Sequence, residues 1–371
     1  MEAAVDFSFW RPVSGWIILQ ACNRLDQVNS GEAILLTGAG GSIGSALAKA
    51  ILASHPEQLI LLDNSERNLS QIDSDLAALA DLGSYTSVLG DICDARLLSE
   101  IFQRYRPKSV YHAAAFKHVP LMETNPFAAV RNNSIGTESL ARVCKAEGVA
   151  NLVMISTDKA VNPISIMGVS KRVAELALLN LNSPQIHMSA VRLGNVWGSH
   201  GSVVPTFLNQ ISRGGPITVT HPEVSRYFLG MEEAVDLILL ASELEQGGVF
   251  IPQLFAPVKI LDMAHELVRK FRPESQKEIR FTFTGLRAGD KMAEEFLYPD
   301  ESAMPTSDER LFKIAGSEDF TNGFDVQMKT LSRSVDERDL SSMIETICQI
   351  VPGYRPTELL RNSSKAMRLN R

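Results

Sequence analysis

The 371-residue sequence contains only four cysteines and has more acidic than basic side chains. The cysteines, at 22, 93, 144 and 348, lie far apart and form no Cys-x-x-Cys pair. This spacing argues against a zinc site or a disulfide framework and fits a reducing compartment, so we expect no metal. The net charge of −7 argues against a nucleic-acid partner, because such proteins carry a basic face that neutralises phosphates. A small anionic ligand, held by backbone amides and a few arginines, stays possible.

The sequence also lacks an N-terminal apolar run long enough to cross a bilayer. The patch at residues 16–19 is far short of the roughly 20 apolar residues that a span needs, and Gln20, Asn23 and Arg24 follow it. No basic segment precedes an apolar core, as it would in a secretory signal peptide. We therefore expect no integral membrane segment, a cytoplasmic location, and an arm packed on the surface for residues 1–30.

Residues 31–195 alternate short apolar runs with amphipathic stretches, a pattern typical of βαβ units in a parallel sheet. Continuous apolar runs such as Ile34-Leu35-Leu36 suit strands that are buried on both faces. The fold class predicted is α/β, with a Rossmann-type doubly wound parallel sheet. The expected strands are 33–37, 58–63, 84–89, 109–112, 151–156 and 187–193. Helices are expected at 44–53, 95–105, 127–147 and 167–181.

Beyond Gly194 glycine and proline become frequent, and the pattern of the first half is lost. Helices are expected at 232–244 and 261–271, followed by a short strand at 279–284. We interpret residues 196–330 as mainly a smaller C-terminal substrate-binding lobe, with some return of the chain to the sheet. Residues 331–371 are predicted to form one helix, 336–350, and a polar tail.

A glycine-rich turn, Thr37-Gly38-Ala39-Gly40-Gly41-Ser42-Ile43-Gly44, joins the first expected strand to a helix. Gly38, Gly41 and Gly44 would allow a tight turn, close approach of the backbone to a pyrophosphate, and close helix–strand packing. The amides at the start of the helix, at Ser42 and Ile43, would hold the phosphates. A glycine-rich turn without a ligand is the alternative. The position between a strand and a helix favours a dinucleotide site, which makes residues 31–195 the cofactor domain.

Further cofactor contacts are expected where the next strands end. Asp63 lies about twenty residues after the glycines, where an acid accepts both adenosine ribose hydroxyls and repels a 2′-phosphate. This favours NAD, although Arg67 is near enough to leave NADP open. Asp91 and Ile92 would flank the adenine, but Asp91 is nearly as well placed to be an acid at the start of the next helix. The small side chains of Ala113-Ala114 would let the cofactor lie against the sheet.

Two segments at the carboxyl edge of the expected sheet carry the residues suited to chemistry. The fifth strand ends in Thr157-Asp158-Lys159, and the next helix carries Met167 and Lys171. Extended short-chain dehydrogenases/reductases usually have Tyr-x-x-x-Lys on this helix, and here Met167 stands at the tyrosine position. The combination resembles the UDP-N-acetylglucosamine 4,6-dehydratases of the polysaccharide-biosynthesis (CapD-like) family, in a subgroup that has methionine for tyrosine.

Other segments in the same order carry the resemblance over about residues 30–300. They include residues 116–120, 133–137, 192–196, 201–205, 218–223, 226–228 and 285–287. The chain departs from the family in three ways. Transmembrane helices that precede the catalytic part of many members are missing, residues 1–30 match no family pattern, and residues 230–232 and 288–290 differ from the usual ones.

The resemblance implies an internal redox reaction, in which NAD oxidises C4 of the hexose before water leaves across C5 and C6. Asp158 would be the acid for the departing C6 hydroxyl, and Lys159 the base at C5. Thr157 would bind the C4 oxygen, and Lys171 the nicotinamide ribose. Met167 has no proton to exchange, so Asp158 or a water would act on the C4 hydroxyl. Structural alternatives are a capping or loop role for Asp158 and core packing for Met167.

The resemblance also implies the remaining contacts. Asn133 and Lys117 would touch the cofactor. The expected substrate residues are Lys117, His118, Glu123, Asn195, Val204, Arg226 and Arg287. The two arginines suit a UDP diphosphate because a guanidinium matches phosphate oxygens, with surface ion pairs as the alternative. Lys117 and His118 have the alternative of a polar loop face, and Glu123 that of a loop surface.

Two other enzyme activities and one non-enzymatic function compete with this hypothesis. A UDP-sugar 4-epimerase would normally need the missing tyrosine. The sequence does not distinguish a dehydratase that inverts C5 from one that retains its configuration. A non-catalytic NAD-binding regulator is disfavoured by the intact Thr157-Asp158-Lys159. Residues 127–147 and 167–181 resemble the pairing helices of this class, so we expect a homo-oligomer, a dimer or higher.

Overall fold

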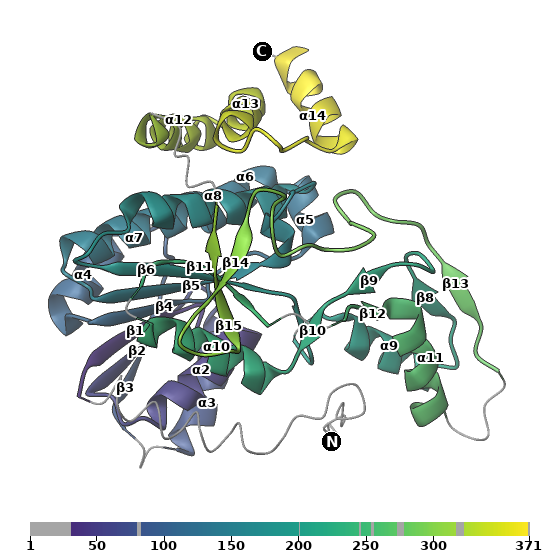
Figure 1. Cartoon of the computed structure of the whole chain (residues 1–371), viewed down its shortest axis with the longest axis horizontal. Coiled ribbons are helices and arrows are strands. Elements are labelled where there is room, and N and C mark those ends of the chain that lie inside the picture. The colour runs from purple at the N-terminus through teal and green to yellow at the C-terminus, as the bar shows by residue number, and fades with distance from the viewer. Residues whose placement is uncertain are drawn as a thin grey trace.

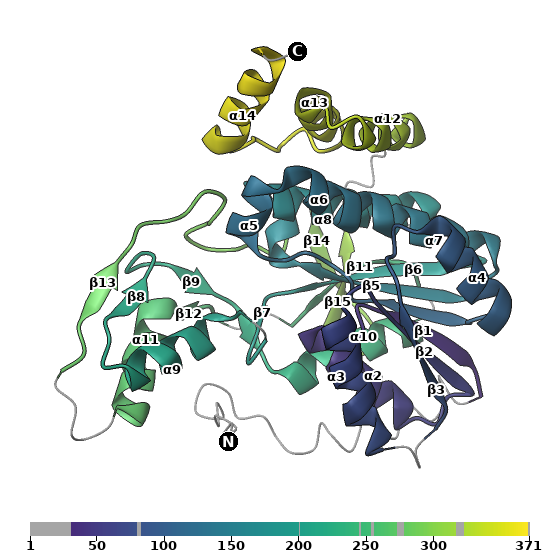
Figure 2. The same cartoon turned by 180° about the vertical axis from the view of Figure 1, so that it is seen from behind.

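The computed structural model describes residues 31–79, 83–199, 201–244, 246–253, 256–272, 278–316 and 323–369. The arm expected at residues 1–30 lies outside these ranges. A nine-stranded sheet forms the centre of the protein (Figures 1 and 2). Its order is β14 (Ser302–Pro305), β15 (Leu311–Ala315), β11 (Gly248–Pro252), β6 (His187–Leu193), β5 (Asn151–Thr157), β4 (Ser109–His112), β1 (Ala33–Thr37), β2 (Gln58–Asp63) and β3 (Tyr85–Leu89).

The seven strands from β11 to β3 are parallel, and β15 and β14 add an antiparallel hairpin at one edge. All residues of β1 and β4 are buried, as the continuous apolar runs predict. The chain leaves β1 towards β2 and β3 and then returns to the other side of β1 at β4. Ligands in such sheets bind outside the carboxyl ends of the strands at this switch point. The predicted Rossmann-type fold is confirmed.

Helices cover both faces of the sheet in two layers (Figure 1). On one face lie α2 (Ser42–Leu52), α3 (Glu66–Ala77) and α10 (Met231–Glu243), which share a core with β1, β2 and β6. On the other lie α4 (Ala95–Tyr105), α7 (Thr137–Ala146) and α8 (Ile166–Leu181). The helix expected over 127–147 begins as α6 (Pro126–Val130) and passes through a π-helical turn, Arg131–Gly136, before α7. Such turns widen a helix locally and are frequent at functional sites.

A smaller lobe lies beside the carboxyl ends of the sheet strands (Figure 2). It contains α9 (Val203–Ser212) and α11 (Ile260–Phe271), which enclose a core of their own. Three short strand pairs complete it: β7 (Asn195–Val196) with β10 (Phe228–Leu229), β9 (Ser225–Arg226) with β12 (Val258–Lys259), and β8 (Ile217–Val219) with β13 (Phe281–Phe283). The chain returns to the main sheet at α10 and β11, and again at β14 and β15.

The prediction of one C-terminal helix over 336–350 is wrong. Three helices occur there: α12 (Phe324–Asp336), α13 (Leu340–Ile350) and α14 (Glu358–Leu369). The break has a local cause, because Arg338 adopts a left-handed φ of 54° and the Asp339 carboxylate caps α13 by accepting from the Ser341 and Ser342 amides.

These three helices form a layer over α5 (Val119–Thr124), α6 and α8 (Figure 1). One buried core joins Leu331 and Met343 of the layer to Val130 and Val173 beneath it. The layer therefore packs on α6 and α8, which belong to the segments expected to pair with another copy. Homo-oligomerisation stays a prediction.

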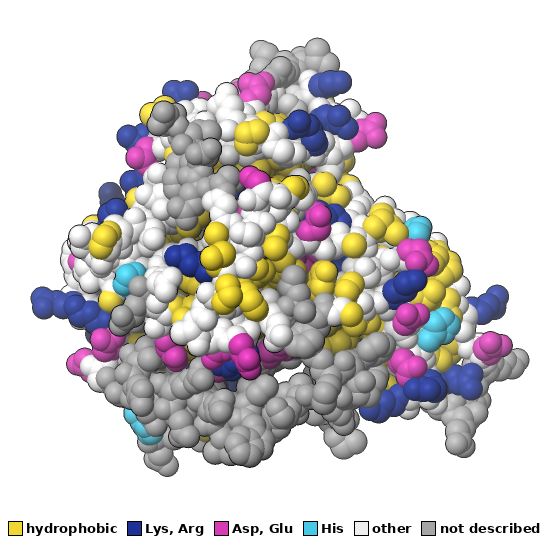
Figure 3. All heavy atoms as spheres, viewed as in Figure 1, with side chains coloured by type: hydrophobic (Ala, Val, Ile, Leu, Met, Phe, Trp, Pro, Cys, Tyr) yellow, Lys and Arg dark blue, Asp and Glu magenta, His cyan; other side chains and the backbone are white. Residues whose placement is uncertain are grey.

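No helix within the described ranges combines the length and apolarity needed to span a bilayer. On the face shown in Figure 3, basic and acidic side chains are interspersed over most of the surface, and several basic side chains lie next to one another at its lower right edge.

Candidate active site

The glycine-rich turn brings three backbone segments into close contact at the switch point. Gly38 has a left-handed φ of 67°, and a Cβ placed there would stand 2.5 Å from the Ala114 amide nitrogen. A Cβ at Gly44 would stand 2.0 Å from the Gly38 carbonyl oxygen. Side chains are thus excluded at both positions, which keeps the turn tight and its backbone accessible. Gly41 precedes α2 without a side-chain cap, so a phosphate can approach the helix N-terminus that contains Ser42 and Ile43.

Asp63 lies at the end of β2 and binds the turn directly. Its Oδ2 accepts from the Gly40 amide at 2.9 Å, and its Oδ1 accepts from the Ser65 amide at 2.8 Å. The carboxylate therefore holds the glycine turn beside the point where the sequence predicts an adenosine ribose. Asp91 accepts from the Cys93 amide. The acid that caps α4 is Asp94, so the alternative of a helix-start role for Asp91 is wrong.

Ile92 is buried beside Gly136 of the π-helical turn, where a Cβ would lie 2.9 Å from its Cδ1. Ala113 and Ala114 back directly onto Gly38, as expected of small residues at the end of β4. Asn133, also in the π-helical turn, is fully buried, and its amide binds both the backbone N–H and C=O of Phe116. Asn133 thus fixes the start of the loop that contains Lys117 and His118.

Lys117 and His118 extend from this loop at the carboxyl edge of the sheet. Partial loss of hydration lowers the pKa of Lys117, and the charge of Lys159 lowers it further. Desolvation, followed by the charge of Lys117, lowers the pKa of His118. A Cβ at Gly201 would lie 2.5 Å from the His118 Cε1. The loop therefore meets the first segment of the lobe and lies near Lys159.

Thr157, Asp158 and Lys159 lie together at the end of β5. Asp158 is fully buried in the 3₁₀ turn Asp158–Ala160, where its Oδ1 accepts from the Thr157 hydroxyl and from Lys159 Nζ, both at 2.9 Å. Within the described structure, the other oxygen, Oδ2, is buried and has no hydrogen-bond partner. The Lys159 side chain is 22% exposed, and its Nζ also donates to Asn195 Oδ1 at 3.2 Å. The site thus presents one buried carboxylate oxygen and one partly exposed amine.

Lys171 is buried on α8, next to the same turn. Burial lowers its pKa to about 8, against an opposing effect of the Glu175 carboxylate. His112, at the end of β4, bonds to Thr37 Oγ1 and Thr137 Oγ1. Burial, and then the Lys171 charge, lowers the pKa of His112 to about 3, so its ring is neutral at physiological pH. Met167 is buried in the core beneath the C-terminal layer.

Lys171→Met should make stability depend less on pH in the alkaline range. The folded pKa of about 8 lies below the ordinary 10.5, so the unfolded chain binds more protons between these values. Burial of the charged Lys171 amine lowers the free energy of unfolding by about 3 kcal/mol below pH 8, and this loss disappears as the pH rises towards 10.5. Urea unfolding of cofactor-free protein should show the variant's relative advantage shrinking over that window. A difference between the two proteins that does not vary with pH would contradict this.

The expected substrate residues of the lobe lie in different environments. Arg226 donates to the carbonyls of Ser225, Lys291 and Met292 rather than forming an exposed ion pair. Arg287 is 61% exposed and pairs with Asp290. The Val204 side chain is buried in the core of the lobe.

Glu123 is buried, so the alternative of an exposed loop residue is wrong. Its Oε1 accepts from the Ile166 amide at the start of α8, and its Oε2 accepts from the Thr357 hydroxyl. Both oxygens are thus engaged in joining α5 to α8 and to the C-terminal layer.

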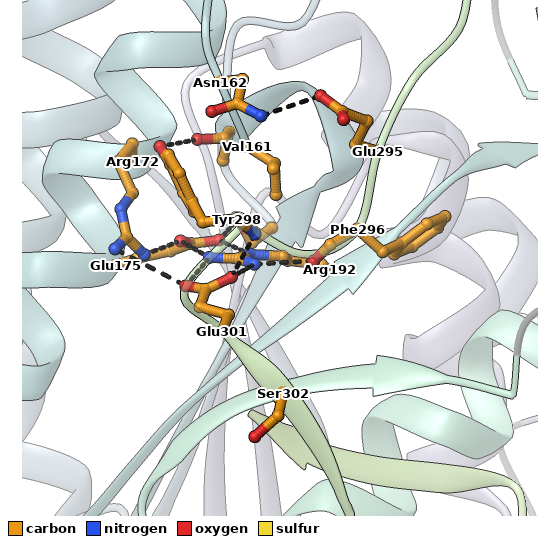
Figure 4. Close-up of polar contacts among 12 residues, drawn as sticks. Val161, Asn162, Arg172, Glu175, Arg192, Glu295, Phe296, Tyr298, Glu301 and Ser302 are labelled. Carbon is orange, nitrogen blue, oxygen red and sulfur yellow. Dashed lines mark hydrogen bonds and ion pairs between the residues drawn. The ribbon is translucent and has the colours of Figure 1, made fainter. Parts of the chain in front are cut away.

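Sequence reasoning missed a buried ion-pair network behind the site, shown in Figure 4. Arg192 of β6 is fully buried and binds Glu175 of α8 and Glu301 in two ion pairs. Arg172 pairs with the same two carboxylates. The Ser156 hydroxyl donates to Glu175, which ties the network to the end of β5. The sequence does contain a signal for this network. Arg192 interrupts an apolar strand, and a charge buried in a strand needs an oppositely charged partner.

No group of three or more His, Cys, Asp or Glu side chains in the described ranges is arranged to hold a metal ion.

Comparison with known proteins shows what this chain is similar to. The family described as polysaccharide biosynthesis protein matches residues 34–316. The capsular polysaccharide biosynthesis protein CapD of Staphylococcus aureus is 45% identical over 274 residues, which are 73% of this chain and 46% of that protein. This chain therefore spans about half the length of that relative.

A UDP-N-acetylglucosamine 4,6-dehydratase (inverting) of Campylobacter jejuni is 32% identical over 78% of this chain and 84% of its own length. Among solved structures, Pen from Bacillus thuringiensis has a TM-score of 0.72 at 28% identity, with 78% of this chain and 90% of Pen covered.

Proposed function

The chain belongs to the polysaccharide biosynthesis protein family, and from that premise we propose that it catalyses the NAD-dependent 4,6-dehydration of UDP-N-acetylglucosamine. The product would be a UDP-4-keto-6-deoxy-N-acetylhexosamine for bacterial glycan biosynthesis. The observation that carries the proposal is the arrangement of Asp158 and Lys159. They lie at the edge of the sheet where ligands bind, with a partly exposed amine and a buried carboxylate oxygen that has no hydrogen-bond partner among the described residues. The similarity to a dehydratase of this specificity supports the substrate.

The residues at the switch point fit a nicotinamide dinucleotide. No side chain blocks the backbone at Gly38 and Gly44, which suits a bound pyrophosphate. Asp63 lies at the end of β2, beside the position expected for the adenosine ribose. Asp91 and Ile92 would flank the adenine, and Lys171 would bind the nicotinamide ribose. The acid at position 63 favours NAD over NADP. When bound, the oxidised cofactor would supply the acceptor for a hydride from C4 of the sugar, and its reduced form the donor for hydride return to C6.

Loss of a hydride from C4, together with transfer of the C4 hydroxyl proton to a water, leaves a ketone, which acidifies the proton at C5. Lys159 Nζ then takes the C5 proton. The C6–O bond breaks in a following step, in which Asp158 protonates the departing hydroxyl to form water. Thr157 binds the C4 oxygen. Hydride addition at C6 and return of a proton to C5 complete the reaction, whose net change is the loss of one water. No external reductant is consumed.

The same reaction with inversion at C5 is the second candidate, favoured by the similarity to the inverting dehydratase of Campylobacter jejuni. Retention and inversion differ only in the face on which C5 is reprotonated. A 4-epimerase is disfavoured because Met167 cannot exchange a proton with the C4 hydroxyl.

The test is proton NMR of purified, NAD-loaded protein with UDP-N-acetylglucosamine in heavy water. We expect a new C6 methyl signal, loss of the C5 proton signal and a hydrated C4 ketone. Couplings in a matched light-water run separate retention from inversion at C5. A parallel incubation with UDP-glucose is the control for the epimerase, which would form UDP-galactose. Protein that holds NAD and leaves each UDP-sugar unchanged would favour the regulator hypothesis.

A further inference from the structure

One irregular segment, residues 290–301, connects the lobe, the 3₁₀ turn that carries Asp158 and Lys159 (the catalytic turn) and the buried ion-pair network. We call this segment the strap. It follows β13 and leads into β14. Figure 4 shows part of it, with Glu295, Phe296, Tyr298 and Glu301 beside Val161 and Asn162.

The strap binds three consecutive residues that directly follow Lys159. The Tyr298 hydroxyl donates to the Ala160 carbonyl at 2.8 Å, and Lys291 Nζ donates to the Val161 carbonyl at 2.6 Å. The Asn162 side chain donates to Glu295 Oε2 at 2.8 Å. Asn162 also has a left-handed φ of 40°, a conformation that persists when its surroundings hold it. The turn that carries Asp158 and Lys159 is thus held from outside its own strand.

The beginning of the strap also contacts the lobe. Arg226 donates to the carbonyls of Lys291 at 2.8 Å and Met292 at 3.2 Å, and Met292 also accepts from the Ser225 amide. Glu294 lies 3.3 Å from Lys291 Nζ and 3.9 Å from Arg226 Nε. Lys291 is therefore in contact with the catalytic turn through its side chain and with Arg226 through its backbone.

The far end of the strap is fixed to the core. Arg192 donates to the Phe296 carbonyl, and the Tyr298 ring lies under the Arg172 guanidinium at 4.7 Å. Burial raises the pKa of Tyr298 to about 12, so its hydroxyl stays a donor across the physiological range. Because the end of the strap at Phe296 and Tyr298 is anchored, a movement of Arg226 has to be taken up by the strap residues 291–298. These residues include the ones that bind the catalytic turn.

We propose that the strap couples a nucleotide diphosphate at Arg226 to the catalytic turn, with Lys291 and Tyr298 as its positioning residues. The inference rests on the proposed function for the place of the diphosphate and for the roles of Asp158 and Lys159. A diphosphate that recruits Arg226 competes with the carbonyls of Lys291 and Met292 for the same N–H donors. The strap shifts when these hydrogen bonds are lost, and Tyr298 and Lys291 pass the shift to the carbonyls of Ala160 and Val161. The catalytic turn is therefore held in its reactive position only when substrate is present.

Tyr298→Phe tests the proposal by removing one hydroxyl. Its control is Tyr354→Phe, which makes the same change in a fully buried tyrosine of the C-terminal layer whose hydroxyl has no hydrogen-bond partner in the described structure. We expect kcat to fall about 10-fold or more in Tyr298→Phe with KM changed less than about 3-fold, because the hydroxyl acts on the reacting groups and not on binding. The control should match the parent in both constants. Unchanged kcat in Tyr298→Phe, or equal losses in both variants, would overturn the proposal.

Hydrogen–deuterium exchange gives a readout that does not depend on turnover. UDP is the probe, added to NAD-loaded protein, and peptides covering residues 158–166 and 223–229 are followed. We expect UDP to slow exchange in both peptides of the parent and of Tyr354→Phe, but only in 223–229 of Tyr298→Phe and Lys291→Met. Protection of 158–166 in all four proteins, or in none, would overturn the coupling. If the parent converts no UDP-sugar, the proposed function fails, while this measurement still decides the coupling.

Discussion

Lys159→Met should reduce the rate of UDP-N-acetylglucosamine dehydration by about 10²–10⁴-fold, the usual contribution of a positioned acid or base. Methionine keeps the length of the side chain but cannot accept the C5 proton. The diagnostic measurement is exchange of that proton with heavy water, followed by NMR beside product formation. The variant should lose both, because C5 deprotonation precedes departure of the C6 hydroxyl.

Asp158→Asn provides the comparison that separates the two roles. An amide cannot protonate the departing hydroxyl, whereas Lys159 would still reach C5. This variant should lose the product but retain C5 exchange. The matched control is Lys49→Met, since Lys49 is exposed on α2 and pairs with Asp75 away from the site. It should keep full activity. C5 exchange that persists in Lys159→Met would mean that another group is the base.

The central sheet and the glycine turn could be predicted because their determinants are local. Ile34, Leu35 and Leu36 form a continuous apolar run, which only a strand buried on both faces explains well. Gly44 is needed by a contact within its own turn, with the Gly38 carbonyl oxygen. The same holds for the end of β5, where Thr157, Asp158 and Lys159 contact one another directly.

The strap and the role of Glu123 could not be read in the same way. The Tyr298 hydroxyl binds the Ala160 carbonyl, 138 positions away in the sequence. Glu123 binds both Ile166 and Thr357, and Thr357 is 234 positions away from Glu123. Neither lies in a periodic pattern, because each works through one side-chain atom that reaches a distant backbone or hydroxyl group. The break between α12 and α13 is different. Asp339, whose carboxylate caps α13, is a preferred N-cap residue and was a usable local signal.

Arg192→Met should lower the free energy of unfolding by about 3–5 kcal/mol, the range for breaking a buried ion pair by removing one partner. Arg192 is fully buried and donates to Glu175, Glu301 and the Phe296 carbonyl. Its removal leaves two buried carboxylates to share Arg172. Arg142→Met is the matched control, because Arg142 also contacts two carboxylates but is 44% exposed. That change should cost about 1 kcal/mol or less. Urea unfolding at pH 7 measures both.

The effect of Arg192→Met should also depend on pH. Burial alone would raise the pKa of Glu175, but Arg192 and Arg172 outweigh it and hold the pKa at about 2, below the ordinary 4.5. The stabilisation from this ionised carboxylate is present above pH 4.5 and is lost as the pH falls from 4.5 towards 2. In Arg192→Met, protonation of Glu175 relieves the uncompensated charge at a higher pH, so the difference in free energy of unfolding between the two proteins should narrow on acidification.

A double variant, Arg192→Met with Glu175→Met, should lose less stability than the two single changes added together, since it leaves no Glu175 carboxylate without its partner. Additive losses that stay constant between pH 7 and pH 3 would mean that Arg192 stabilises the protein through packing of its side chain and not through the ion pair.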